Sequence, residues 1–282
     1  MKRTLLTLLL TLLSGASLVY AQSDSLVIVN AAWQVTTTAD GLVHKQAQIK
    51  NLYGSVQSIN LIEIAPEAKR KIGIASDRSM KRTSIQAAAH GAIAAVNGSF
   101  YDMKEGNSVC FYKIDREVID NTLDSEFERR VTGAIREKKG RLEIIEWSKP
   151  IEQAYKGKRG TVLASGPMML EDGKQSDWSM CNESFITTRH PRSAIYTTRD
   201  GKVVFLTVDG RSKENAGGMS IPELMYLIRV LGGCEALNLD GGGSTTLWID
   251  GHEGSGVVNY PCDNRKFDHA GERRVSNCIY AY

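Results

Sequence analysis

Residues 237–246 read Leu-Asn-Leu-Asp-Gly-Gly-Gly-Ser-Thr-Thr, so an apolar run ends in one acidic side chain, three glycines and three hydroxyls. The run from Cys234 to Leu239 is short and apolar, which is typical of a buried strand. Three consecutive glycines let a ligand approach the backbone closely, and their N–H groups can form an anion-binding nest. A flexible turn without a ligand is the alternative. Asp240 before the glycines, with Ser244 and Thr245 after them, favours a binding loop.

A helix with two marked ends is predicted directly before this strand. Ser220, followed three residues later by Glu223, forms a capping box. Pro222 is tolerated in the first turn, because the amides there lack helical partners. Gly232 and Gly233 end the helix. The glycine loop itself is not a P-loop, because no lysine follows the glycines and the Walker spacing is absent.

The same order of elements occurs earlier in the chain. Residues 79–90 have the pattern of a helix, Gly91 ends it, and the apolar run at 92–96 is typical of a buried strand. That run leads into a second polar cluster, which begins with Asn97 and Gly98. Strands that each end in a polar cluster with glycine beside it predict a site at one rim of a sheet.

Strands dominate the rest of the chain, and most are joined by tight turns that contain glycine. The polar segment 149–159 is predicted to be a surface loop. The sequence therefore predicts an α+β fold: a mixed, mainly antiparallel sheet system with few helices and the site at one rim of the sheet. The further predicted strands span residues 33–37, 42–49, 56–64, 71–75, 131–136, 141–147, 161–164, 193–198 and 202–208.

A hairpin that turns at residues 200–201 brings charged residues together. Arg192 precedes its first strand, and Asp209 and Arg211 follow its second. Because the two ends of a hairpin lie side by side, Arg192 is predicted to lie close to Asp209 and Arg211. The alternatives are a simple turn at Asp209 and a surface ion pair worth less than about 1 kcal/mol.

These residue types suit a phosphate-linked sugar. Arg192 and Arg211, with a glycine nest, suit phosphate, which accepts paired hydrogen bonds from guanidinium groups. Asp209 and Asp240 suit acid–base work or attack at an anomeric carbon. The amide of Asn97 and the hydroxyls after the glycines suit sugar hydroxyls or phosphate oxygens.

Other chemistries find less support in the sequence. No serine lies on a G-x-S-x-G elbow, so no serine-hydrolase triad is indicated. The carboxylates could bind a divalent cation such as calcium, but no EF-hand spacing occurs. No cofactor is therefore implied, and the metal requirement stays open.

The first 21 residues have the pattern of a secretory signal peptide. Lys2 and Arg3 form a basic start, and the apolar stretch at 5–13 is too short to span a bilayer. We therefore expect an exported, periplasmic or extracellular protein that is monomeric and has no membrane anchor. Without Lys2 and Arg3 the formal net charge falls from +3 to +1, which gives no support for nucleic-acid binding.

Five cysteines in an oxidising compartment leave at least one unpaired within the chain. Cys181 and Cys262 lie in polar, loop-like sequence, and we expect them to form a disulfide. The close cysteine or histidine spacing that a zinc site requires does not occur. Residues 22–282 contain no low-complexity linker and no sustained repeat, so a single domain is predicted.

The order of these clusters resembles that of the phosphodiester glycosidase family. The resemblance covers residues 90–282, and its most specific string is the one at 238–246. It implies cleavage of the bond between the anomeric carbon and the phosphate in a sugar-1-phosphodiester, for example an alpha-N-acetylglucosamine-1-phosphodiester. The matching strings are AVNGSF at 95–100, SGP at 165–167, HPRSAI at 190–195, VDGR at 208–211, GMS at 218–220, NLDGGGSTT at 238–246 and ERRVSN at 272–277.

The resemblance also implies a set of site residues. On physical grounds Arg192 and Arg211 would hold and neutralise the phosphodiester, and Asp240 or Asp209 would act as nucleophile or base. A phosphomonoester is a competent leaving group, so a strong general acid is less necessary than in ordinary glycosidases. The residues at matching positions are Asn97, Arg192, Asp209, Arg211, Asp240, Gly242, Gly243, Ser244, Thr245 and Arg273.

Two other functions compete with this one. A non-catalytic carbohydrate-binding or exopolysaccharide-processing accessory protein would use the same pocket for binding without turnover. A phosphodiesterase would break the P–O bond and release a sugar-1-phosphate instead of the free sugar.

Overall fold

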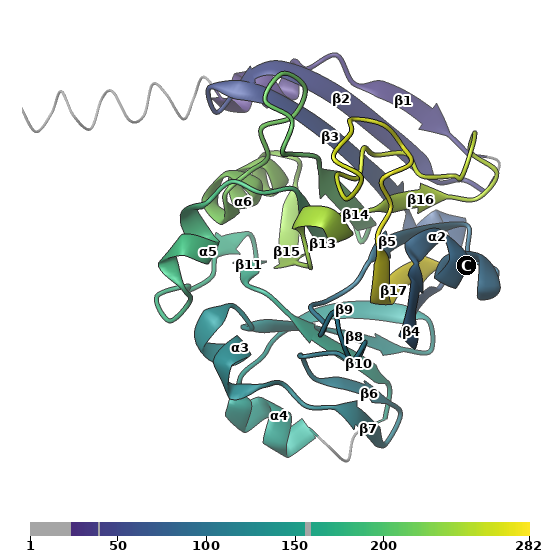
Figure 1. The fold of residues 1–282 in the computed structure, drawn as a ribbon, viewed down its shortest axis with the longest axis vertical. Helices are drawn as coiled ribbons and strands as arrows, with labels where there is room; N and C mark the ends of the chain where they lie inside the picture. Colours follow the sequence, from purple (N-terminus) through teal and green to yellow (C-terminus); the bar gives the residue numbers. More distant parts are fainter. Residues whose placement is uncertain (1–23, 39, 156–158) are drawn as a thin grey trace, which may run out of the picture.

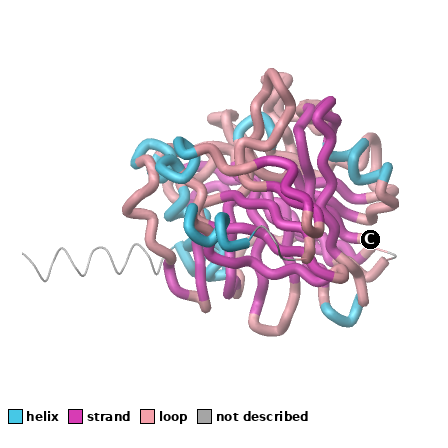
Figure 2. The backbone as a smooth tube through the Cα atoms, turned by 90° about the horizontal axis from the view of Figure 1, so that it is seen from below, coloured by secondary structure: helices cyan, strands magenta, loops and turns pink. Residues whose placement is uncertain are grey.

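The computed structural model describes residues 24–38, 40–155 and 159–282 (Figure 1). The predicted signal peptide, residues 1–21, lies outside these described residues. The described chain forms three sheets whose strand pairs are antiparallel. The helices lie around the edges of the strand-rich centre (Figure 2). The predicted α+β class with mainly antiparallel sheets is confirmed.

The largest sheet has eight strands, and the two smaller sheets have five and four. The order in the largest is β1 (Gln34–Thr37), β2 (Val43–Leu52), β3 (Ser55–Ile64), β14 (Val203–Val208), β13 (Arg192–Thr198), β15 (Gly233–Asn238), β11 (Met168–Glu171) and β12 (Lys174–Gln175). The five-stranded sheet has the order β7 (Glu117–Asp120), β6 (Tyr112–Ile114), β10 (Thr161–Ser165), β8 (Gly133–Lys138) and β9 (Arg141–Glu146). The four-stranded sheet has the order β16 (Leu247–Ile249), β5 (Ala94–Asn97), β17 (Arg274–Ala281) and β4 (Ile72–Arg82).

The eight-stranded sheet is the central layer, because apolar packing covers both of its faces. In β3, Ile59 and Leu61 belong to the core cluster that includes the residues of the long helix α6 (Ile221–Val230). Ile62 and Ile64 belong to the cluster shared with the two smaller sheets. Successive side chains of a strand point to opposite faces, so a strand buried on both sides needs a nearly continuous apolar run.

Two helix–strand units deliver polar residues to the same edge. The capping box predicted for α6 is present: Glu223 N donates to the Ser220 hydroxyl (3.4 Å), and Ser220 N donates to the Glu223 carboxylate (2.9 Å). The helix leads through the glycines into β15, as predicted. In the second unit α2 (Thr83–Ala89) leads into β5, which ends at Asn97.

Two predictions of secondary structure are corrected. The helix predicted over 79–90 begins only at Thr83, because β4 continues to Arg82 and pairs there with Arg274. Tertiary pairing thus overrides the helical pattern of these four residues. The predicted surface loop at 149–159 begins with α4 (Lys149–Tyr155). The remaining short helices are a helix at residues 24–29, η1 (Pro66–Ala68), α3 (Asp124–Arg129), α5 (Glu183–Thr187) and η2 (Gly242–Ser244).

The predicted disulfide between Cys181 and Cys262 is wrong. All five thiols are free in the structure. Cys181 lies in the loop before α5, next to Trp178, whereas Cys262 lies in a C-terminal loop, 3.6 Å from the carbonyl oxygen of Gly242. The polar sequence around both cysteines identified loops correctly, but it carried no information on which loops are neighbours. Within the described residues, no helix has the length and apolarity needed to cross a bilayer.

The cap of α6 yields a first prediction. Replacing Ser220 by Ala removes the hydroxyl that accepts the Glu223 N–H, so the free energy of unfolding is expected to fall by about 1 kcal/mol in urea denaturation. The matched control is Ser125→Ala, an exposed position in α3, where a change under about 0.5 kcal/mol is expected. Equal losses in the two variants would contradict a stabilising cap.

Candidate functional site

Asp240 lies two residues after the end of β15, and its peptide group is held on both sides. Its N–H donates to Gly98 O (3.0 Å), and its carbonyl accepts from Asn97 Nδ2 (2.7 Å). The other amide atom, Asn97 Oδ1, accepts from the Ser193 hydroxyl (2.6 Å) and from Thr246 N–H (3.0 Å). Asn97 therefore fixes the backbone of Asp240 and joins the polar ends of β5, β13 and β15.

The glycines after Asp240 make room for two arginines. Gly242 has a φ of +62°, a left-handed conformation that favours glycine, and a Cβ there would lie only 3.0 Å from Arg211 Nη2. A Cβ at Gly243 would collide with the guanidinium of Arg273. Guanidinium groups of the chain itself thus approach the glycine backbone closely, and the anion-binding nest stays a prediction.

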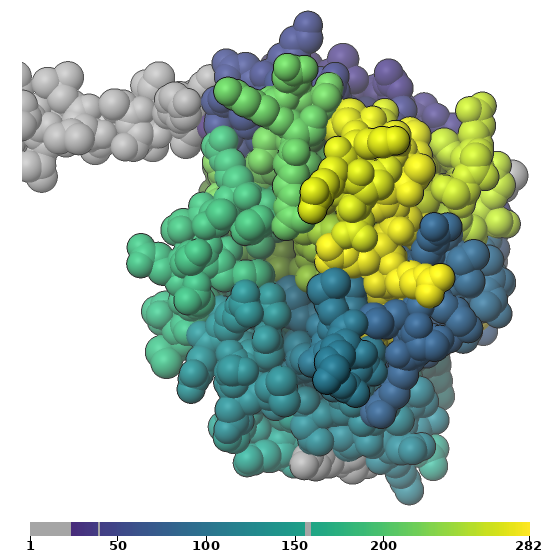
Figure 3. Space-filling view, viewed as in Figure 1, coloured from purple at the N-terminus to yellow at the C-terminus, as the bar shows by residue number. Residues whose placement is uncertain are grey.

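These arginines line a cavity of about 390 Å³, which we call the basic cavity. It is lined mainly by residues 262–273 of the loop before β17, which we call the C-terminal loop. This loop is part of the yellow surface beside green and purple segments in Figure 3. Arg273 is paired through its Nε with the carboxylate of Asp263 (2.8 Å). Four cationic side chains against one carboxylate make this cavity suited to an anion. The cationic residues are Arg211, Arg265, Lys266 and Arg273.

Asp240 has a perturbed carboxyl group. It is partly exposed, yet its carboxyl lies deep enough for burial to raise its pKa above the ordinary value. The Ser244 hydroxyl and the positive charges of Arg130 and Arg273 oppose this rise. A carboxyl with a raised pKa beside a basic cavity is a candidate for acid–base or nucleophilic work.

The hydroxyls of Ser244 and Thr245 are buried without a hydrogen bond of good geometry to any described residue. Buried polar atoms are nearly always paired, so these two oxygens suit a water or a substrate atom. Ser244 nevertheless lies near enough to Asp240 and Tyr101 to lower the pKa of both.

Sequence reasoning missed two neighbours of Asp240. Tyr101 donates its hydroxyl to Arg274 O (3.0 Å) and interacts electrostatically with Asp240. Arg130 stacks 3.5 Å above the ring centroid of Phe100. Tyr101 could have been found, because it directly follows the AVNGSF string. Arg130 gave no signal, because it ends a short polar helix that is distant in sequence.

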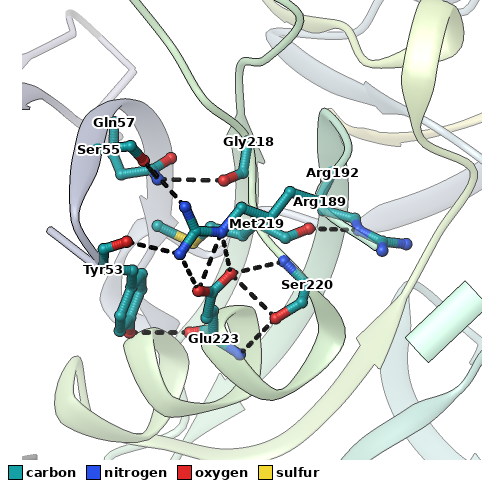
Figure 4. Close-up of polar contacts among 9 residues, drawn as sticks. All are labelled: Tyr53, Ser55, Gln57, Arg189, Arg192, Gly218, Met219, Ser220 and Glu223. Atoms are coloured by element: carbon teal, nitrogen blue, oxygen red, sulfur yellow. Dashed lines mark hydrogen bonds and ion pairs between the residues drawn. The ribbon is translucent and has the colours of Figure 1, made fainter. Parts of the chain in front are cut away.

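The guanidinium of Arg192 is not directed to the basic cavity. Only 2% of the residue is exposed. Its Nε donates to Met219 O (2.9 Å), beside the Arg189–Glu223 ion pair (Figure 4). Its Nη2 donates to the carbonyls of Phe185 (3.1 Å) and Thr188 (2.8 Å). Burial lowers the pKa of Arg192 to about 10.

Asp209 lies on the other side of the sheet from Arg192. The register pairs Arg192 with Val208, so the backbones are adjacent, but consecutive side chains of a strand point to opposite faces. The Asp209 carboxylate accepts from the Ser58 hydroxyl (2.7 Å), Asn259 Nδ2 (2.9 Å) and Tyr260 N–H (2.9 Å). Burial raises its pKa, and these hydrogen bonds oppose the rise.

The structure therefore brings together most of the predicted residues around the glycine loop and places three of them, Asn97, Arg192 and Asp209, in supporting positions. Asp240, Arg211, Arg273 and the loop residues 242–245 form one group at the rim of the sheet. Asn97 lies behind this group. In the described part of the chain, no three His, Cys, Asp or Glu side chains converge as metal ligands.

Comparison with known proteins gives one family match and distant relatives. A family model described as phosphodiester glycosidase matches residues 90–282. The N-acetylglucosamine-1-phosphodiester alpha-N-acetylglucosaminidase of Mus musculus is 24% identical over 188 residues, which cover 62% of this chain and 34% of the relative. The chain thus spans about a third of the length of that curated relative.

Two solved structures share the fold. The catalytic domain of zebrafish N-acetylglucosamine-1-phosphodiester alpha-N-acetylglucosaminidase, auto-inhibited by its pro-peptide, superposes with a TM-score of 0.65 at 15% identity, covering 90% of this chain and 82% of that one. A hypothetical protein from Synechocystis superposes with a TM-score of 0.62 at 15% identity, covering 88% of this chain and 63% of that one.

The electrostatics around Asp240 yield a second prediction. Arg273→Gln removes a positive charge that lowers the pKa of the Asp240 carboxyl, so that pKa is expected to rise. Carbon-13 NMR titration of labelled aspartate, with Asp240→Asn for assignment, measures it. Arg274→Gln, at the exposed neighbouring position, should leave the pKa unchanged. A fall in the Arg273 variant would contradict the assigned contact.

The Asp209 contacts yield a third. Asp209→Ala leaves the Ser58 hydroxyl, the Asn259 amide and the Tyr260 N–H without their acceptor, so the free energy of unfolding should fall by about 3 kcal/mol or more. Asp250→Ala, at an exposed turn, should change it by less than about 0.5 kcal/mol in the same urea titration. If the free energy of unfolding of Asp209→Ala equals that of the wild type, the Asp209 carboxylate does not stabilise the fold.

Proposed function

The chain belongs to the phosphodiester glycosidase family, and on this premise we propose that it hydrolyses the bond between the anomeric carbon and the phosphate oxygen of a sugar-1-phosphodiester. The observation that carries the proposal is the position of two guanidinium groups. Arg211 and Arg273 lie against Gly242 and Gly243, the second and third residues after Asp240. An anion-binding cavity and a perturbed carboxyl are thereby adjacent, which this substrate requires.

Arg211 and Arg273 are the groups we assign to the phosphodiester. Guanidinium donates paired hydrogen bonds to phosphate oxygens and keeps its charge at any working pH. Arg265 and Lys266 add positive charge at the same cavity. As the glycosidic bond breaks, its electron pair goes to the phosphate oxygen, and these cations stabilise the phosphomonoester that leaves.

Asp240 is the group we assign to the anomeric carbon, as nucleophile or as the base that activates water. The oxygen of water ends on the anomeric carbon, and its proton is released. Ser244 and Thr245 offer unpaired hydroxyls to sugar or phosphate oxygens. Asn97, Arg192 and Asp209 are assigned positioning roles, because their polar atoms are taken by backbone and side-chain partners.

We further propose that residues 22–282 act as one exported, monomeric domain and that the sugar is alpha-N-acetylglucosamine. The sugar is suggested by the names of the curated and structural relatives. Export is suggested by the pattern of residues 1–21. The assignment of the phosphate to the basic cavity does not depend on export, on the oligomeric state or on the identity of the sugar.

Product analysis tests the function. The protein is incubated with an alpha-N-acetylglucosamine-1-phosphodiester, and the products are separated by anion-exchange chromatography. Free N-acetylglucosamine and a phosphomonoester are expected, with a rate at least about a hundredfold lower in Asp240→Asn. Asp250→Asn, the same change at an exposed turn, is the matched control and should retain the wild-type rate.

Two outcomes would contradict the proposal. Release of N-acetylglucosamine-1-phosphate would move the cleaved bond to phosphorus. Binding without any product would favour the accessory protein that uses the pocket only for recognition.

A further inference from the structure

A second cavity lies beside the basic one and differs from it in chemistry. Its volume is about 520 Å³, and every described residue that lines it is uncharged. We call it the amide cavity, because five of its lining side chains are carboxamides. They are Gln34, Gln46, Gln48, Asn60 and Asn215.

The amides form a regular array on one face of the sheet. Gln34 in β1 pairs with Gln46 in β2, and Gln46 pairs with Asn60 in β3, so three amides stand in a row across three strands. Gln48 lies two residues further along β2, on the same face. Gln46 Nε2 donates to Gln34 Oε1 (2.8 Å), which orients that pair. A carboxamide has both donors and an acceptor, so the amide atoms not bonded within the chain suit a hydroxyl-rich ligand. Asn60 is 1% exposed and its Oδ1 is bonded to His44 Nε2 (3.2 Å), so it mainly orders the row.

Aromatic rings form the opposite wall. Tyr260 and Phe267 line the cavity, and their rings stack with centroids 4.1 Å apart at 10°. His269 stacks on Tyr260 as well, with centroids 4.4 Å apart. Rings held by mutual stacking are ordered before a ligand arrives, which reduces the entropy lost on binding. Phe267 and His269 cover the two faces of Tyr260, so the apolar C–H face of a pyranose can pack on the outer face of Phe267 while its hydroxyls reach the amides.

The buried carboxylate of Asp209 connects the two walls. It accepts from Ser58 in β3 and from the N–H of Tyr260 in the C-terminal loop. Ser58 itself lines the cavity. The spacing between the sheet and the C-terminal loop is therefore fixed by hydrogen bonds and not left to a mobile loop.

The two cavities are neighbours. Phe267 lines both. Ser212 lines the basic cavity and Asn215 the amide cavity, and Asn215 Nδ2 donates to Ser212 Oγ (3.0 Å). A ligand whose phosphate lies against Arg211 can therefore continue past Phe267 along the amide row.

We propose that the amide cavity binds a neutral oligosaccharide segment of the substrate, beyond the phosphate, so that the protein acts on phosphate-linked glycan chains of several sugars. This inference deepens the proposed function and rests on it for the placement of phosphate in the basic cavity. Strands β1 to β3, which supply the amide row, lie outside the matched residues 90–282.

Binding of phosphate-free glycans tests the inference without turnover. Full-length Asp240→Asn protein is titrated calorimetrically with chitohexaose, maltohexaose, cellohexaose and mannohexaose, each with and without inorganic phosphate. At least one hexasaccharide is expected to bind, and phosphate should not displace it, because phosphate occupies the other cavity. In the same background, Gln34→Val with Gln46→Val should weaken that binding roughly tenfold or more, since two amide partners are lost.

Gln175→Val is the matched control, because Gln175 is an exposed glutamine in β12 at the far edge of the same sheet, and it should leave the affinity unchanged. Valine suits a strand, and unchanged inorganic phosphate binding confirms that the double variant is folded. The inference is overturned if no hexasaccharide binds, if phosphate displaces it, or if the double variant binds as tightly as its parent. Failure of the proposed hydrolysis would instead appear in the product assay, independently of whether the hexasaccharides bind in this titration.

Discussion

The site depends on how the peptide group of Asp240 is held. Asn97 donates to its carbonyl and Gly98 accepts from its N–H, so the last residue before the glycine loop is clamped between two sheets. The same Asn97 side chain accepts from Ser193 and Thr246, which adds a third strand and the far end of the loop. A single buried amide with all its polar atoms engaged is costly to replace, because each lost contact leaves a partner unsatisfied. The direction in which the Asp240 carboxyl points is a consequence of this clamp.

Positive charge is used in two different ways around this clamp. Arg211 and Arg273 contact the backbone of Gly242 and Gly243, and both line the basic cavity, where a ligand can reach their guanidinium groups. Arg192 is buried, and its Nε and Nη2 donate to three backbone carbonyls. A buried guanidinium is tolerated when carbonyl dipoles replace its water, and in return it holds the segments around Phe185 and Met219 together. Sequence alone could not separate these uses, because both begin with an arginine beside a polar strand end.

Much of the fold could be predicted, because its signals are local. The Ser220–Glu223 cap, the glycines that end α6 and the apolar alternation of the strands depend on neighbours in sequence. The errors occurred where distant contacts decide. Pairing with β17 keeps β4 extended up to Arg82, and contacts of Glu152 with Thr122 and Trp147 order a helix in a polar segment. Likewise the glycine loop, Asp240 and Arg273 could be found from sequence, whereas Arg130, Arg265 and Lys266 required the folded chain.

The Tyr260–Phe267 loop has a consequence for how this protein can change over evolutionary time. It is joined to the sheets through the Tyr260 N–H and the Asn259 amide, which both donate to Asp209, so the rings of Tyr260 and Phe267 do not themselves make these connections. Mutations of Tyr260 and Phe267 can alter which glycan chains are accepted, while Gly242, Gly243 and the arginines that contact them stay unchanged. The glycines have no such freedom, because a side chain at Gly243 would displace Arg273. If these rings recognise the glycan as we propose, related proteins can differ in the glycans they accept through Tyr260 and Phe267 alone, while the glycine loop and the cations of the basic cavity keep the same chemistry.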